Sequence, residues 1–305
     1  MYMLSESVLR DGRTSDVLLK PTKFKFETFT DNHMHLDPRN GEGLVAVKKF
    51  QRAGGKYIFL VCKTTRDVGI SLKDAESFER LYDHTIKFAA DINDRGEVKA
   101  FPVIGMHPAE VVEMCREFSA PKAVEVAMKA LEIAGDKVTV GEAVAIGEVG
   151  RPHFEVEEKV MRACDEVLRH AFRVARDADC AVQVHAVDTG GLFAEIKDMA
   201  KEAKMNPKRV IKHFSSPRIM AASKAGIYPS IVATEENVTK AGKEGNRFLM
   251  ESDYIDDLRR PGVVVGPKSV PRVSRRLMNK GVLREEDLWK IHVDNIEKAY
   301  GIILD

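Results

Sequence analysis

The chain has 305 residues, a formal net charge of +1 and 31% charged residues. This balance excludes a basic surface that coats nucleic acid, although a local basic patch remains compatible with it. Charged residues interrupt the first twenty positions and no later apolar run is long enough to cross a bilayer, so we expect no secretory signal and no membrane span. The sequence does not indicate an oligomeric state.

The cysteines are far apart in the sequence and form no CxxC pair: Cys62, Cys115, Cys164 and Cys180. This spacing favours free, reduced thiols over a disulfide framework or a cysteine metal site. We therefore expect a cytoplasmic location.

The first conspicuous stretch runs from Phe29 to Asp37 and holds His33 and His35 at the end of a predicted strand. Residues two apart in a strand project from the same face, so both imidazoles are expected to point inward. Two imidazoles held in this way can share a zinc ion or a similar divalent ion. The alternative is an exposed strand with two polar residues on its wet face.

Short apolar runs alternate with longer amphipathic ones along the rest of the chain. With the opening strand, the predicted strands are Tyr57 to Cys62, Ala100 to Ile104, Val144 to Val149, Ala181 to His185, Val210 to Phe214, Tyr228 to Ala233 and Phe248 to Asp253. The predicted helices are Leu44 to Ala53, Ala75 to Ile92, Ala120 to Ala134, Val156 to Ala178, Leu192 to Ala203, Arg218 to Ala225, Glu235 to Lys240 and a C-terminal pair.

Eight strands that are too apolar to face water on one side, each followed by a helical segment, favour a parallel barrel. The predicted fold class is therefore α/β, a single-domain (β/α)8 TIM barrel, with residues 27–305 forming the barrel and residues 1–26 a short N-terminal extension that packs across its floor. The rival is an open doubly wound sheet. No glycine-rich phosphate turn follows the first strand, and this argues against the rival.

Polar side chains end several of the later apolar strands. Glu148 lies between two glycines, His185 and His213 end the fifth and sixth strands, and Glu251 and Asp253 share one face of the eighth. A lone buried carboxylate costs several kcal/mol unless it is paired or binds a metal. Each residue alone could be a hydrogen-bonded core residue. Together they converge on the C-terminal rim, where barrel enzymes keep their chemistry, and they favour a metal site.

A basic stretch follows the eighth strand. Residues 258–280 contain Arg259, Arg260 and further lysines and arginines but no acidic residue. In a barrel this loop lies over the active site, and arginines match the geometry of phosphate. The stretch favours a phosphate-bearing substrate, although its charges are also consistent with the solvated face of the last helix.

These motifs together resemble the TatD-type metal-dependent hydrolases of the amidohydrolase superfamily, in an archaeal-type branch. The resemblance rests on Asn32 to His35, Gly105 to Pro108, Gly147 to Gly150, Val184 to Ala186, Lys212 to Ser215, Glu251 to Asp253 and Asp294 to Gly301. It implies a (β/α)8 barrel with two divalent metal ions, zinc, magnesium or manganese. The resemblance would place His33, His35, Glu148 and Asp253 around one ion, and Glu148, His185 and His213 around the other.

Two loops depart from the family pattern. Arg151-Pro152-His153 replaces the usual Leu-Asp after the fourth strand, and the segment from Phe214 to Arg218 replaces Phe-Ser-Gly after the sixth. Arg151 and Arg218 make these loops basic, which favours an anionic substrate or a changed substrate choice.

The resemblance implies phosphodiester hydrolysis, chiefly deoxyribonuclease activity, on DNA or a nucleotide. In this interpretation Glu148 bridges the metals, Asp253 orients and deprotonates the attacking water, and His107 contacts the substrate. His107 could instead be a rim histidine that is hydrogen-bonded to a neighbouring loop. Two other functions stay open: an amidohydrolase-type enzyme that opens a small amide or lactone, and a non-catalytic metal-binding scaffold.

Overall fold

A single parallel sheet forms the centre of the molecule. The structure, a computed structural model, describes residues 26–304, so the predicted extension over residues 1–26 lies outside the described residues except for Phe26. The strands follow the order β8-β7-β6-β5-β4-β3-β2-β1-β9, and each neighbouring pair is parallel. They are β1 Phe29–His35, β2 Gly55–Val61, β3 Lys99–Ile104, β4 Ala145–Gly150, β5 Ala181–His185, β6 Val210–Lys212, β7 Tyr228–Val232, β8 Leu249–Glu251 and β9 Tyr254–Ile255.

The sheet closes on itself through the segment that follows β8. The amide of Asp253 donates to the carbonyl of His33 at 2.9 Å, and the amide of Asp256 donates to the carbonyl of His35 at 3.0 Å. The short strand β9 pairs with β1 between these two bonds. This closure confirms the TIM barrel and excludes the open doubly wound sheet.

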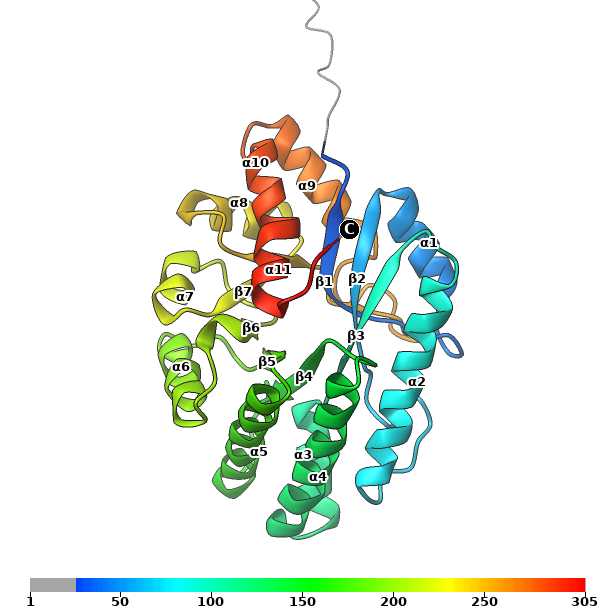
Figure 1. The fold of residues 1–305 in the computed structure, drawn as a ribbon, viewed down its shortest axis with the longest axis vertical. Coiled ribbons are helices and arrows are strands. Elements are labelled where there is room, and N and C mark those ends of the chain that lie inside the picture. Colours follow the sequence, from blue (N-terminus) through cyan, green and yellow to red (C-terminus); the bar gives the residue numbers. More distant parts are fainter. Residues whose placement is uncertain (1–25, 305) are drawn as a thin grey trace, which may run out of the picture.

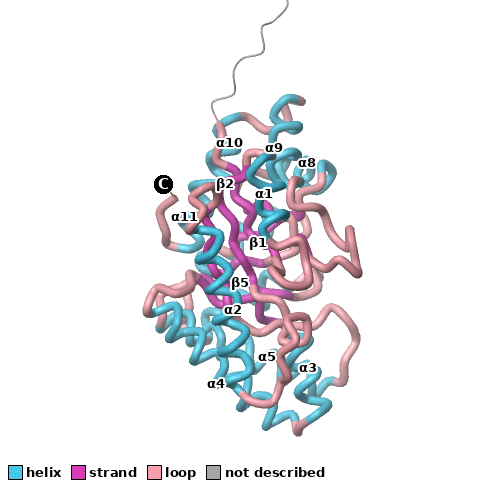
Figure 2. Tube along the Cα trace, turned by 90° about the vertical axis from the view of Figure 1, so that its right-hand side faces the viewer, coloured by secondary structure: helices cyan, strands magenta, loops and turns pink. Residues whose placement is uncertain are grey.

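The helices surround the strands in chain order (Figure 1). They are α1 Leu44–Arg52, α2 Ala75–Asn93, α3 Pro108–Glu117, α4 Ala120–Thr139, α5 Glu158–Asp177, α6 Leu192–Glu202, α7 Ile219–Ala225, α8 Glu235–Glu244, α9 Ser269–Asn279, α10 Glu285–Trp289 and α11 Asn295–Tyr300. Short 3-10 and π segments cover Pro207–Arg209 and Lys290–Asp294. Figure 2, turned by 90°, shows the strands in the middle with helices around them.

Local sequence explains where several helices begin. The Asp74 carboxylate accepts the amide proton of Ser77 at 3.0 Å and so caps α2, and Ser119 caps α4 through the amide of Lys122. Helix α5 buries an apolar stripe at helical spacing that includes Val160, Cys164 and Val167. Helix α3 is absent from the sequence prediction. It starts with Pro108 at its first position, directly after the capping residue His107.

Aromatic side chains fill the part of the barrel near the N-terminal ends of its strands. Phe59 of β2 stacks on Tyr300 of α11, with ring centroids 3.9 Å apart, and Phe59 also stacks on Phe101 of β3. Helix α11 therefore supplies a plug for the N-terminal end of the barrel, opposite the rim where the polar strand ends meet.

Two sequence expectations concern the whole chain. All four cysteines are free thiols, as expected. No helix within residues 26–304 is long and apolar enough to span a membrane.

His292 gives a prediction about stability and pH. This fully buried ring lies in the π segment, where Nδ1 accepts the amide proton of Thr30 at 3.3 Å and Nε2 lies 2.9 Å from the Ser274 hydroxyl. Burial lowers the pKa of His292 to about 3.

The unfolded chain therefore binds a proton at this residue that the folded chain does not, and stability is lost as the pH falls below about 6.5. Between pH 7.5 and 5 this histidine should cost about 2 kcal/mol of unfolding free energy. We expect His292→Gln to remove that share of the pH dependence. Urea unfolding of the wild type and the variant at both pH values, in the presence of a chelator, measures this. The prediction is contradicted if the unfolding free energy of the variant changes between the two pH values as much as that of the wild type.

Candidate metal centre

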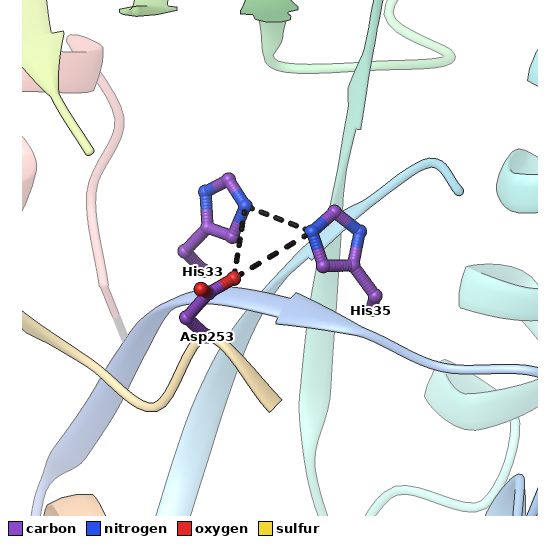
Figure 3. Close-up of side chains that lie close together, drawn as sticks. All are labelled: His33, His35 and Asp253. Carbon is purple, nitrogen blue, oxygen red and sulfur yellow. Dashed lines mark hydrogen bonds and ion pairs between the residues drawn. The ribbon is translucent and has the colours of Figure 1, made fainter. Parts of the chain in front are cut away.

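His33 and His35 lie at the C-terminal end of β1 and point to the same place. Their Nε2 atoms are 3.0 Å apart, and each lies 3.8 Å from the Asp253 Oδ1 atom. Figure 3 shows the three side chains turned toward one another. Asp253 reaches this position because its backbone adopts a left-handed φ of 48° two residues after the end of β8, while its amide bonds to β1. The predicted strand-end pairing is thus present in the fold.

Glu148 extends from β4 between two sets of histidines. Its Oε1 atom lies 3.6 Å from His33 Nε2 and 3.3 Å from His35 Nε2. Its Oε2 atom lies 2.7 Å from His185 Nδ1 and 3.1 Å from His213 Nε2. One carboxylate therefore presents one oxygen to each set, which is the arrangement of a bridging ligand.

The second set is as compact as the first. His185 Nδ1 and His213 Nε2 are 3.3 Å apart. His33, His35 and Asp253 form one compact set, and His185 and His213 form another, with Glu148 between the two. Three overlapping clusters could hold a cation: His33-His35-Asp253, His33-Glu148-His213 and His107-Glu148-His185. The structure thus brings together the six residues for which the family resemblance implies metal binding.

Hydrogen bonds on the far side of each ring fix which nitrogen faces the centre. His35 Nδ1 donates to the carbonyl of Val61 at 3.2 Å, His33 Nδ1 lies 2.6 Å from the Gln183 amide oxygen, and His213 Nδ1 lies 3.2 Å from Glu251 Oε1. Each ring thus uses Nδ1 for a protein acceptor and leaves Nε2 for the centre. His185 is reversed, because its Nε2 contacts His153 Nδ1 at 3.2 Å and its Nδ1 faces Glu148.

This donor set fits a metal ion. When His33 and His35 donate through Nδ1, their Nε2 atoms carry no proton and present only lone pairs. These two Nε2 atoms face each other at 3.0 Å, with carboxylate oxygens beside them. Such an arrangement is repulsive unless a cation lies between the lone pairs. The ligand–ligand separations are close to the edges of about 3.3 Å expected around an ion with bonds of about 2.0 Å. Neutral imidazole with carboxylate is a set that zinc and similar divalent ions bind.

The charges within the site support the same interpretation. Burial would raise the pKa of Glu148, but nearby histidines, His213 foremost, hold it well below its usual value. Burial lowers the pKa of His213, yet Glu148 and Glu251 outweigh this effect and raise it to about 10. Burial raises the pKa of Asp253 to about 7. Without a metal, protons must neutralise the site, and a bound cation would replace them.

A cavity of about 880 Å³ opens above the carboxylates and histidines. His35, Glu148, His185, His213 and Asp253 line its floor, and His107, His153 and residues of the loops after β2, β5, β6 and β9 line its walls. The volume suits a small-molecule or nucleotide-sized ligand.

His107 faces this cavity from the end of the loop after β3. Its Nδ1 accepts the amide proton of Ala109 at 3.0 Å, which caps helix α3. Burial lowers the pKa of His107 to about 4, so the ring is neutral and carries its proton on Nε2. It therefore offers a hydrogen-bond donor to the cavity rather than a lone pair for a metal.

The four arginines singled out in the sequence all have acidic partners. Arg151 binds Asp165 and Glu195, and Arg218 binds Asp188. Arg259 and Arg260 share Asp257, at 3.0 and 2.9 Å. Among these four arginines, Arg260 alone lines the cavity.

Glu251, which the sequence already suggests as a support for a ligand, contacts His213, but sequence reasoning missed Gln183 and His153. Gln183 accepts from His33 and uses its own amide to donate to the carbonyl of Asn32 at 3.0 Å and to the Tyr300 hydroxyl at 2.6 Å. The sequence could have indicated this role of Gln183. It lies two residues before His185 on an apolar strand, so its side chain points to the same inward face as that histidine. Nothing local in the sequence indicates the partnership of His153 with His185.

Comparisons with known proteins agree with this geometry. The profile of the family described as TatD related DNase matches residues 30–301. The chain belongs to the TatD related DNase family. It is 41% identical over 279 residues to the uncharacterized protein MJ1127 of Methanocaldococcus jannaschii, covering 90% of this chain and 96% of that one. It is thus a hydrolase of the TatD family with a candidate site for two metal ions.

Solved structures show the same fold at low sequence identity. The TatD homolog YJJV from Escherichia coli K12 superposes with a TM-score of 0.63 at 17% identity, covering 90% of this chain and 98% of that chain. The phosphotriesterase homology protein from Escherichia coli superposes with a TM-score of 0.57 at 12% identity, with the same coverage of 90% and 98%.

The bridging geometry predicts how many ions this TatD-family protein binds. We expect about two divalent ions per chain in the wild type and one or fewer in Glu148→Gln, because the amide cannot offer an anionic oxygen to both sites. Elemental analysis of protein loaded with zinc and then desalted measures this. Glu110→Gln is the matched control, since Glu110 is also a buried glutamate but lies outside the cavity. One ion in both the wild type and Glu148→Gln would show that Glu148 does not bridge.

The hydrogen bond between His33 and Gln183 leads to a prediction about metal affinity at the site formed by His33, His35 and Asp253. Gln183→Leu keeps the size of the side chain but leaves His33 Nδ1 without its acceptor, so affinity at that site should fall about 10- to 100-fold. Zinc competition against a chromogenic chelator measures the affinity. Gln51→Leu on α1, at the only other glutamine of the chain, is the control and should change nothing. Equal zinc affinities in the wild type and both variants would show that Gln183 does not support metal binding.

Proposed function

We propose that this protein is a divalent-metal-dependent phosphodiesterase that acts on DNA, a nucleotide or a similar phosphate ester. The observation that carries the proposal is Glu148, whose two oxygens face two separate sets of histidines. A purely structural metal needs no bridging carboxylate and no cavity above it. Membership of the TatD related DNase family supports a phosphoester substrate, and the related barrel from Escherichia coli is described with phosphate in its active site.

Two divalent ions held by these residues would bring the pKa of a water molecule toward neutrality and would neutralise charge on a phosphoryl oxygen. The protein's own residues would then complete the reaction. Asp253 lies at the cavity floor with one oxygen turned to His33 and His35, so it is placed to orient the water and accept its proton.

Two residues of the cavity wall would hold the substrate. His107 Nε2 carries a proton and can donate to a phosphoryl oxygen or to the leaving oxygen. Arg260 reaches the cavity while its guanidinium keeps Asp257 as a partner, so it can contact a phosphate at the mouth. Arg151, Arg218 and Arg259 would act further out, by shaping the loops around the cavity.

The test of the activity is a screen of zinc-, manganese- and magnesium-loaded protein. It should include bis(4-nitrophenyl) phosphate, single-stranded and duplex DNA, and a small lactone and amide as the competing substrates. We expect phosphodiester hydrolysis that a chelator abolishes. Lactone or amide turnover without phosphodiester turnover would replace the proposal with the amidohydrolase-type alternative.

A substitution at Asp253 tests whether this residue acts in proton transfer or mainly in metal binding. Asp253→Asn keeps the size of the side chain and one acceptor but loses basicity, so kcat should fall about 10²- to 10⁴-fold while the fold and most of the metal remain. KM should change little. Turnover and metal content should be measured on the same sample. Near-normal turnover in a metal-replete variant would contradict the assignment, and loss of an ion would make Asp253 chiefly a ligand.

A further inference from the structure

Part of the mouth of the cavity is apolar. Three large apolar side chains that line it are also about half exposed: Val187 at 51%, Phe214 at 51% and Val263 at 53%. They come from the loops after β5, β6 and β9 respectively. Exposed apolar side chains from three separate loops on one pocket mark a binding surface rather than scattered surface residues.

Phe214 is the one of these three that the fold holds in an uncommon conformation. Its φ is 47°, in the left-handed region that bulky residues rarely adopt. Its amide donates to Glu251 Oε1 at 2.7 Å, and its carbonyl accepts from the buried ammonium of Lys212 at 3.3 Å. Two buried charged groups thus hold the backbone of a residue whose side chain is half exposed. The cost of this conformation is consistent with a functional role for the ring.

The same carboxylate connects Phe214 to the metal centre. Glu251 Oε1 accepts from the Phe214 amide and contacts His213 Nδ1 at 3.2 Å. The ring of Phe214 stands next to that of His213, with centroids 6.0 Å apart and planes at 67°. A group attached to a phosphate at His213 would therefore meet the exposed part of the Phe214 ring.

The charges of the rim restrict what this group can be. Arg151 and Arg218 have their own carboxylate partners, whereas Arg259 and Arg260 share Asp257. The uncompensated positive charge at Asp257 is enough for a single phosphate but not for a run of phosphates. A partly apolar mouth with mostly compensated arginines matches a single phosphate that carries a flat apolar group better than it matches a long polyanion.

We propose that Phe214, with Val187 and Val263, is the specificity-determining platform of the cavity, and that it binds a planar aromatic group carried by the phosphoester, either on the phosphate itself or on a sugar attached to it. This inference rests on the proposed phosphodiesterase function and names its substrate class. The aromatic group is either a nucleobase at the end of a strand or nucleotide, or an aryl group of a non-nucleotide ester. Both would pack on the exposed Phe214 ring.

Binding without turnover tests the platform independently of catalysis. With zinc-loaded protein, calorimetry should show that phenylphosphonate binds about tenfold more tightly than ethylphosphonate, the low end of what stacking on one aromatic ring contributes. Phe214→Ala should lose this preference, and Phe214→Leu, which keeps an apolar side chain without a ring, should lose most of it. Phe154→Ala is the matched control, because Phe154 is 40% exposed but does not line the cavity.

Hydrolysis then separates the two proposals. Phenyl 4-nitrophenyl phosphate and ethyl 4-nitrophenyl phosphate share a leaving group, so Phe214→Ala should lower kcat/KM about tenfold for the first, through KM, and less than twofold for the second. Thermal unfolding confirms that each variant is folded. If the hydrolysis of thymidine 5′-(4-nitrophenyl phosphate) shows the same dependence on Phe214, the aromatic group is a nucleobase; if only the phenyl ester does, it is another aryl group.

Equal binding of the two phosphonates, no binding of either, or equal losses for both esters would overturn the platform. Hydrolysis of both esters without any aromatic preference would leave the phosphodiesterase standing and remove the platform. An aromatic preference in binding without hydrolysis of any phosphodiester would support the platform and contradict the phosphodiesterase function.

Discussion

The constraint on which the site depends is a buried carboxylate that must satisfy two groups of imidazoles at once. Glu148 lies at the centre of the barrel rim with one oxygen directed to β1 and the other to β5 and β6. This position demands that three distant segments of the chain arrive at one point. A closed parallel barrel meets that demand, because all its strands end on the same rim. The closure between Asp253 and β1 therefore matters to the chemistry as much as to the fold.

Below the ligands, a layer of hydrogen bonds decides how each ring is turned. Gln183, Glu251 and the carbonyl of Val61 accept from the outer nitrogens and leave the inner ones for the centre. The glutamine in turn is fixed by Tyr300, whose hydroxyl also donates to Asn32 at 2.7 Å. The orientation of His33 thus depends on a residue of the plug at the opposite end of the barrel.

The sequence predicts the strands and most helices well, because apolar runs and amphipathic periods are local. It also predicts the metal-site candidates, since residues at the ends of parallel strands must converge. It fails where the backbone leaves the regular pattern: the predicted sixth and eighth strands are too long, because Phe214 and Asp253 turn into the left-handed region. It also cannot show that Arg151 pairs with Asp165 and Glu195, or that His153 meets His185, since these contacts depend on how the loops pack.

The position of Tyr300 has a consequence for the order in which this protein matures on the ribosome. Strands β1 to β9 are complete once residue 255 has been made, yet the hydroxyl that fixes Gln183, and through it His33, arrives 45 residues later. A nascent chain without α11 has the ligands but lacks the plug that aligns them. Because synthesis runs from the N-terminus, the contacts that align His33 through Gln183 are complete only after α11 has been made.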